Sequence, residues 1–238
     1  METRKIQVTG KSTFIVSLPK KWAKKVNLGS GDSVMMVPLP DGTLLIDPRV
    51  SMREKQTSRK MISVDGKENE NLFRTFIGAY LAGFNVIEFR SSREIPKETR
   101  QLIRELTGRV IGPEVVDEAA QSITLADLLN ASDFSLGKGL RRMHIIARSM
   151  HQTAISVLKS HDEETVKEVK DRDDEVDRLY WLVAKQHNCV LKDASFADSI
   201  GATPQEATGH LLIARSLERI ADHATRIAHN ALNLKNDA

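Results

Sequence analysis

The chain of 238 residues is poor in cysteine and aromatic side chains and has no long hydrophobic run. Its single cysteine, Cys189, cannot form an internal disulfide and has no second thiol for a Cys-x-x-Cys metal site. Apolar runs such as VMMVPLP, residues 34–40, are far shorter than the roughly 20 residues of a membrane helix. The first residues show no secretory h-region. We therefore expect a cytoplasmic protein that does not insert into a membrane.

Motifs of common catalytic sites are also missing. The sequence has no Walker loop, no HExxH and no GxSxG. A di-iron oxidase in a helical bundle needs Glu-x-x-His pairs on facing helices, but Glu218 is followed three residues later by Ala221, and Glu206 by Gly209. We expect a protein that is not an enzyme.

Charge is unevenly distributed along the chain, although its net value is only +3. Residues 1–60 carry twelve Lys or Arg and five Asp or Glu, a balance of +7 that leaves −4 for the remainder. A basic module joined to a larger acidic one indicates that the N-terminal part meets a polyanion and that the rest has a different role.

Residues 1–50 alternate strand-like runs with Gly or Pro punctuation: RKIQVTG, STFIVSLP, GDSVMMVPLP and GTLLIDP. The run PKKWAKKVNL between them predicts one short helix that starts at Pro19 and has Gly29 as its C-terminal cap. About fifty residues bury little apolar surface, so we expect a second copy to complete the core.

The run VTGKSTFIVSLPKKWAKKVNLGSGDSV resembles the AbrB/MazE/SpoVT family of swapped-hairpin DNA-binding domains. The resemblance lies in Leu18, Pro19, the helix to Leu28 and the run Gly31-Asp32-Ser33-Val34, whereas the turn at Gly10-Lys11-Ser12-Thr13 departs from the Lys-Gly-Gln type of many members. It implies a dimer that contacts DNA through its β-surface, with Arg4, Lys5, Lys11, Ser12 and Thr13. The short helix offers a second basic set, with Lys20, Lys21 and Lys24. The alternative is a protein-docking module on which these charges only confer solubility.

Residues 61–132 predict an α+β domain of βαβαββ pattern, with helices near NLFRTFIGAYLAGF and IPKETRQLIRELTGRVI. We find no chemical motif in it, and the arginines at 90, 93, 100 and 104 fit solvated faces.

Residues 136–236 predict three long helices. In the first, apolar residues recur at spacings of three and four, as in a bundle seam: Leu136, Leu140, Met143, Ala147, Met150, Ala154 and Val157. Ser160 or Asp162 is expected to cap the second helix, and the run Thr203-Pro204-Gln205-Glu206 is expected to start the third after a loop.

Acidic residues fall on the same packing surfaces. The apolar register of the second helix places Asp173 on the seam and Asp177 beside it, whereas Asp171, Asp174 and Glu175 fall elsewhere. In the last helix Glu218 and Asp222 have the same i, i+4 relation next to two apolar seams that include Ile213 and Ile220. Inward acids need cations. The candidates are arginines, through pairs such as Asp174–Arg178 and Asp222–Arg226, or a metal held by oxygen ligands, with His223 as a nitrogen donor.

The run SLERIADHATRIAH, residues 216–229, is similar to the signature of PhoU proteins, negative regulators of phosphate uptake whose E/D-x-x-x-D motifs bind iron or other metals. Glu218 and Asp222 match this motif directly, and Asp173 and Asp177 match it more loosely, with Asp174 as the other candidate. The resemblance implies a divalent or ferric ion such as iron, zinc, manganese or magnesium. An AbrB-like head joined to a PhoU-like tail resembles archaeal phosphate-uptake regulators.

The sequence thus predicts a multidomain α+β protein: a swapped-hairpin domain at 1–50, an α+β domain at 61–132 and a three-helix bundle at 136–236. We expect a homodimer or higher oligomer that binds DNA and metal and regulates phosphate uptake. The alternative is an adaptor that does not bind DNA and docks on a phosphate transporter subunit or a signalling protein, its acids paired with arginines.

Overall fold

The computed structural model describes residues 3–10, 12–38, 42–48, 58–129 and 134–236. The chain divides into two compact units, Met1–Gln56 and Thr57–Ala238. Within the described residues, no helix is long and apolar enough to cross a bilayer.

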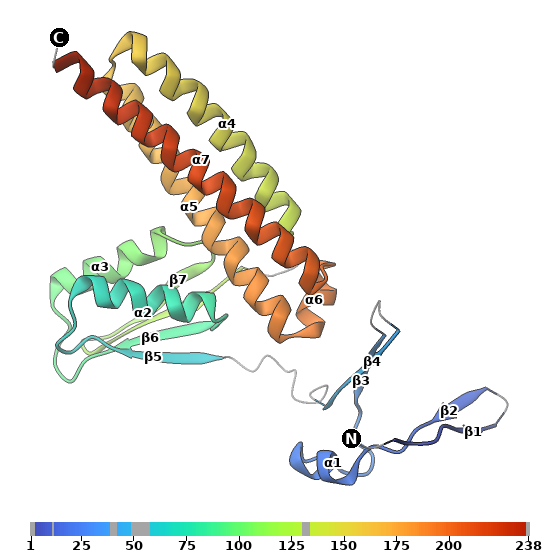
Figure 1. Ribbon diagram of the computed structural model, residues 1–238. Helices are drawn as coiled ribbons and strands as arrows, with labels where there is room; N and C mark the ends of the chain where they lie inside the picture. Colours follow the sequence, from blue (N-terminus) through green and yellow to red (C-terminus); the bar gives the residue numbers. More distant parts are fainter. Residues whose placement is uncertain (1–2, 11, 39–41, 49–57, 130–133, 237–238) are drawn as a thin grey trace. The chain divides into compact units, whose positions relative to one another are not determined.

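The N-terminal unit consists of two antiparallel hairpins and one short helix (Figure 1). Strand β1 (Gln7–Thr9) pairs with β2 (Thr13–Ile15), β3 (Met35–Pro38) pairs with β4 (Leu44–Asp47), and α1 (Lys20–Lys25) lies between the hairpins in the chain. This confirms the expected small antiparallel strands. The expected Gly29 cap is wrong: the left-handed residue after α1 is Asn27, with φ of 56°, and the Gly29 N–H instead donates to the Asp32 carboxylate at 2.7 Å.

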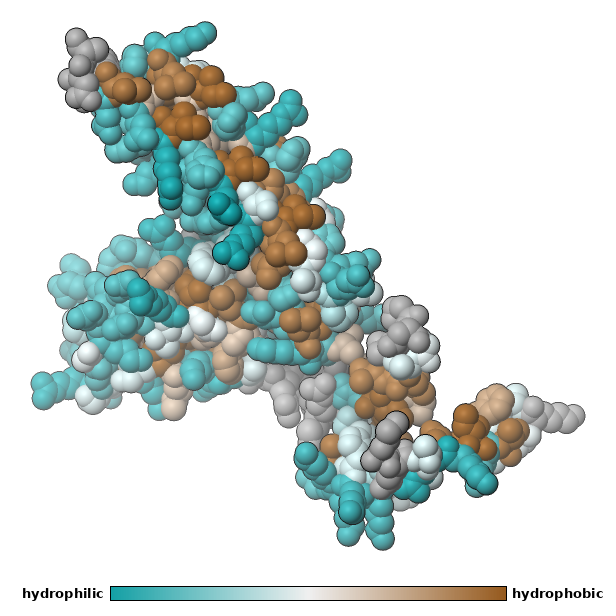
Figure 2. Space-filling view, in the orientation of Figure 1, coloured by the Kyte–Doolittle hydropathy of each residue, from teal (hydrophilic) through white to brown (hydrophobic). Residues whose placement is uncertain are grey.

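Apolar side chains of this unit lie on its surface. Phe14 is 73% exposed and Val8 is 61% exposed, and Figure 2 shows apolar surface over both hairpins. Among the side chains described in this unit, only Asp47 is buried. The described residues of one copy therefore form no hydrophobic core of their own.

The second unit begins with a mixed four-stranded sheet covered on one face by two helices (Figure 1). Its elements are β5 (Arg59–Ser63), α2 (Asn69–Leu81), β6 (Val86–Arg90), α3 (Lys97–Gly108), β7 (Pro113–Glu118) and β8 (Ser122–Asp127). The strand order is β5-β6-β8-β7, with β5 parallel to β6 and the other pairs antiparallel. Phe76, Tyr80 and Phe89 fill the core between sheet and helices, so the expected α+β domain is confirmed.

Three long helices and one short helix follow: α4 (Leu136–Ser160), α5 (Glu163–Lys192), α6 (Ala194–Ile200) and α7 (Pro204–Asn236). Asp162 caps α5 by accepting a hydrogen bond from Thr165 N. At the start of α7, the Glu206 carboxylate accepts from Thr203 N at 2.8 Å and Glu206 N donates to Thr203 Oγ1, the two bonds of a capping box.

The short helix α6 lies where the sequence predicts a loop. Its first turn forms because the Asp193 carboxylate accepts hydrogen bonds from Ser195 N and Phe196 N. Gly201, with φ of +63°, ends it in the left-handed conformation that glycine adopts without strain.

Small residues let the long helices pack closely. The α7 seam is made of alanines, and Ala214, Ala221 and Ala228 are fully buried against α4 and α5. Their register leaves the preceding positions at the edge of the packed face. Ile213 and Ile220 are therefore 52% and 43% exposed. The expected second seam is thus wrong at these two positions, whereas its members Leu217 and Ala224 are buried and Ile227 packs against the core.

Helix α5 joins the bundle to the sheet. Lys185 forms a partly buried ion pair with Asp127 of β8, and its Nζ lies 4.7 Å from the centre of the Tyr80 ring. One turn on, Asn188 Nδ2 donates to the Leu81 carbonyl at 3.1 Å. These contacts explain why sheet and bundle form a single compact unit.

Candidate functional site

Four carboxylates gather where α5 packs against α7. Val169, Val176 and Val183 are fully buried and fix the rotation of α5. This rotation leaves Asp173 and Asp177 partly buried beside the seam. On α7, Glu218 and Asp222 are also partly buried, at positions flanking the alanine seam.

The pKa values show that these carboxylates interact. Burial, together with the nearby charges of Asp173, Glu218 and Asp222, raises the pKa of Asp177 to about 7. Burial also raises the pKa of Asp173 and that of Glu218, and Asp222 is the next cause for both. The two helices therefore bring like charges together in a site that is partly shielded from water.

Basic residues offset the charge of this group only in part: Arg215 and Arg219 lower the pKa of Glu218, but burial and the charge of Asp222 raise it more. Among the described residues, none of the four forms an ion pair, and the buried Asp173 Oδ1 has no hydrogen-bond partner. Thr225 lies near enough to lower the pKa of Asp173 somewhat, but its own Oγ1 makes no hydrogen bond of normal geometry with any described residue.

The expected arginine pairs do not form. Asp174 binds Arg109, which follows α3, at 3.1 Å rather than Arg178, and no ion pair joins Asp222 to Arg226 in the described part of α7. His223 is exposed. Asp174 differs from the four seam acids in having an arginine partner, although its charge still raises the pKa of Asp173 and that of Asp177.

The four carboxylates are oxygen ligands, which suit a hard cation. Carboxylate oxygens, one of them buried without a partner, are ligands that Mg²⁺, Mn²⁺ and iron accept. As the side chains lie, no three His, Cys, Asp or Glu within the described ranges are arranged to hold one ion. Mutual repulsion of uncompensated carboxylates favours such separation. A bound cation would have to draw the side chains together.

The DNA-binding candidates lie on the surface of the N-terminal unit. Arg4, Lys5, Ser12 and Thr13 are exposed on or beside the first hairpin, whereas Lys20, Lys21 and Lys24 are exposed on α1. Lys11 lies outside the described residues. The two basic sets thus belong to different elements of the unit.

Two residues near the acids were not predicted from sequence. Thr225 occupies a seam position of α7, so helical periodicity alone would have found it. Arg109 contacts Asp174 across 65 residues of chain, and no local pattern indicates such a pair.

Comparison with known families assigns both ends of the chain. Residues 140–231 match the PhoU domain, and residues 7–54 match the domain described as antidote-toxin recognition MazE, bacterial antitoxin. No curated protein and no solved structure gave a significant match. The expected pairing of domains is therefore confirmed: this chain joins a MazE-type domain at its N-terminus to a PhoU domain in its helical bundle.

Proposed function

We propose that the protein is a cytoplasmic DNA-binding regulator of phosphate homeostasis, whose N-terminal unit binds DNA as a dimer and whose bundle binds a metal cation. The observation that carries this proposal is the presence of a MazE-type domain and a PhoU domain in one chain. The first domain type supplies a way to read DNA, and the second supplies the link to phosphate.

The charge of the N-terminal residues supports DNA as the partner. Residues 1–60 carry a balance of +7, and the lysines of α1 are all exposed. Clustered cations on a protein release counterions from the DNA backbone, which makes binding favourable and dependent on salt. Phosphate contacts of this kind position a protein on DNA, and the few side chains that reach a groove read the sequence.

Fluorescence anisotropy with labelled duplex DNA tests this role in the full-length protein. We expect affinity to fall steeply between 50 and 200 mM salt, on the order of a hundredfold or more if several phosphates are contacted. Arg4→Gln with Lys5→Gln should weaken binding and reduce the salt slope by about one per lost phosphate contact. Lys20→Gln with Lys21→Gln is the matched comparison and should have the smaller effect. Binding that does not respond to salt would count against DNA as the partner.

The exposed apolar side chains of the hairpins support a dimer. A surface that exposes Ile6, Val8 and Phe14 together is unfavourable in water, and a unit of about fifty residues has too little surface to bury alone. Pairing with a second copy would cover both hairpins and place two basic surfaces on one DNA duplex.

Replacing Phe14 with Asp tests the dimer. We expect the full-length protein to change from dimer to monomer and to lose most of its DNA affinity, because a buried charge at the interface is unpaired. Light scattering coupled to size-exclusion chromatography measures the mass. Val116→Asp, which alters an exposed strand residue of β7, is the control and should leave the dimer intact. A Phe14→Asp variant that stays dimeric would exclude this interface.

We further propose that Asp173, Asp177, Glu218 and Asp222 hold the cation. A bound cation would neutralise the four charges and tie α5 to α7, and iron, zinc, manganese and magnesium are the candidates. The alternative adaptor with arginine-paired acids is less favoured, because none of the four acids forms an ion pair with an arginine among the described residues, although Arg215 and Arg219 lie near enough to lower the pKa of Glu218. A transporter subunit or signalling protein remains a candidate partner of the bundle.

A further inference from the structure

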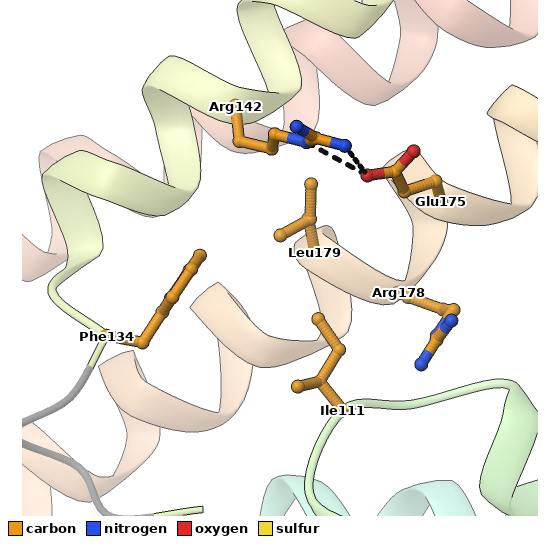
Figure 3. A pocket seen from close by; sticks show the side chains of 6 residues that line it. All are labelled: Ile111, Phe134, Arg142, Glu175, Arg178 and Leu179. Atoms are coloured by element: carbon orange, nitrogen blue, oxygen red, sulfur yellow. Dashed lines mark hydrogen bonds and ion pairs between the residues drawn. The ribbon is translucent and has the colours of Figure 1, made fainter.

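A pocket of about 470 Å³ lies between the bundle and the loop after α3. It is lined by Ile111, Phe134, Arg142, Glu175, Arg178 and Leu179 (Figure 3). Its volume falls within the range of small-molecule sites, which are mostly apolar and carry a few polar groups that fix the orientation of the ligand.

The apolar floor of the pocket is held in place from several sides. The Ile111 carbonyl accepts a hydrogen bond from the Tyr80 hydroxyl at 3.0 Å, and the Phe134 carbonyl accepts one from Gln186 Nε2. The Phe134 ring lies against Gly139 of α4, where a Cβ would come within 3.2 Å of its Cε1. A floor fixed by these contacts is formed before any ligand arrives.

The rim of the pocket carries an excess of positive charge. Arg142 Nε and Nη2 both donate to one Glu175 oxygen, at 2.9 and 2.6 Å. Arg178 extends from α5 on the side of the pocket near Ile111 (Figure 3), and among the residues that the structure describes it has no hydrogen-bond or ion-pair partner. All N–H groups of its guanidinium are therefore available to a ligand.

We propose that this pocket binds a small organic anion, with its phosphate or carboxylate group on Arg178 and its apolar body on Phe134, Ile111 and Leu179. Guanidinium groups bind these two anions through paired hydrogen bonds. A cation would meet two arginines and a carboxylate that is already paired. A neutral ligand would cover Arg178 without satisfying it, which costs binding free energy.

This site is separate from the proposed cation site, although both use α5. Glu175, Arg178 and Leu179 lie on a different face of α5 from Asp173 and Asp177, as helical spacing requires. The inference therefore goes beyond the proposed function and does not depend on it. An anion held here would contact both α5 and the sheet domain.

Isothermal titration calorimetry of the full-length protein tests the proposal with phenyl phosphate and benzoate. Two part-ligands are also titrated: inorganic phosphate has the anionic group without the ring, and benzyl alcohol has the ring without the anionic group. We expect at least one of the two aromatic anions to bind once per chain, and both part-ligands to bind more weakly. Arg178→Gln should weaken that binding about tenfold or more, because a charge-assisted hydrogen-bond pair is lost. Phe134→Ala should weaken binding of the aromatic anion but not binding of inorganic phosphate.

Arg148→Gln, which changes an exposed arginine elsewhere on α4, is the matched control and should leave binding unchanged. Asp177→Asn should also leave it unchanged, which separates this site from the cation site. Circular dichroism of each variant shows whether it is folded. Absence of binding by both aromatic anions, equal binding of benzyl alcohol, or equal affinities of Arg178→Gln and Arg148→Gln would overturn the proposal.

Discussion

At pH 8 and without metal, Asp177→Asn is expected to make the protein more stable than wild type by about 2 kcal/mol. The folded-state pKa of Asp177 is about 7, against an ordinary value of 3.8. This difference corresponds to about 4 kcal/mol at most, and solvent screening of a partly buried group reduces it to about 2 kcal/mol.

The pH dependence has a definite sign. Because the folded state keeps a proton that the unfolded state releases, wild type loses stability as pH rises from about 4 through 7, and the loss is complete above 7. Asparagine carries no charge at any of these pH values, so the free energy of unfolding of the variant does not fall for this reason. Urea unfolding of both proteins at pH 4 and pH 8 measures it. Asp171→Asn, at an exposed position of α5, is the control and should not differ from wild type.

With a bound cation, wild type should instead be more stable than Asp177→Asn. In wild type, binding to the folded state alone raises the free energy of unfolding by about 2.7 kcal/mol at a hundredfold excess over Kd, whereas Asp177→Asn should gain much less. Elemental analysis of untagged protein, beside a Glu218→Ala, Asp222→Ala variant, measures the metal directly. Equal metal content in the two proteins, or wild-type stability that falls no more with pH than that of Asp177→Asn, would refute the site.

Lys185→Met is expected to destabilise the second unit by about 3 to 5 kcal/mol, because it leaves the carboxylate of Asp127 buried without its cation. Both residues are partly buried, and only 12% and 8% of their side-chain surfaces are exposed. Lys185 also lies over the Tyr80 ring. Urea unfolding followed by far-ultraviolet circular dichroism measures the loss.

A second variant separates the ion pair from simple packing. Lys185→Met combined with Asp127→Asn removes both charges, so part of the lost stability should return. Asp127 Oδ1 also accepts a hydrogen bond from Leu129 N at 3.2 Å, and asparagine can preserve it. Lys167→Met changes an exposed lysine of α5 and should shift stability by less than about 0.5 kcal/mol. A similarly small effect of Lys185→Met would show that the pair does not hold sheet and bundle together.

Local patterns predicted most elements because local interactions form them. The spacing of Met143, Met150 and Val157 determines which face of α4 is buried, and Asp162 and Thr203 start helices through hydrogen bonds within one turn. Sequence patterns did not predict α6, because the segment between its caps, Asp193 and Gly201, is too short to show helical periodicity.

The sequence by itself determined the order of the strands and of all helices except α6, the basic N-terminal module and the two domain types. It also determined the positions of Asp173, Asp177, Glu218 and Asp222 along their helices. Periodicity, capping and charge act over a few residues, so they can be read along the chain.

Only the tertiary structure decided which partners those residues meet. Asp174 binds Arg109 instead of Arg178, and Lys185 reaches Asp127 across 58 residues. Ile213 is left at the edge of the bundle, and Arg178 lies at the rim of a pocket. Each outcome depends on how separate elements pack, and many side chains of suitable charge or size compete for the same place.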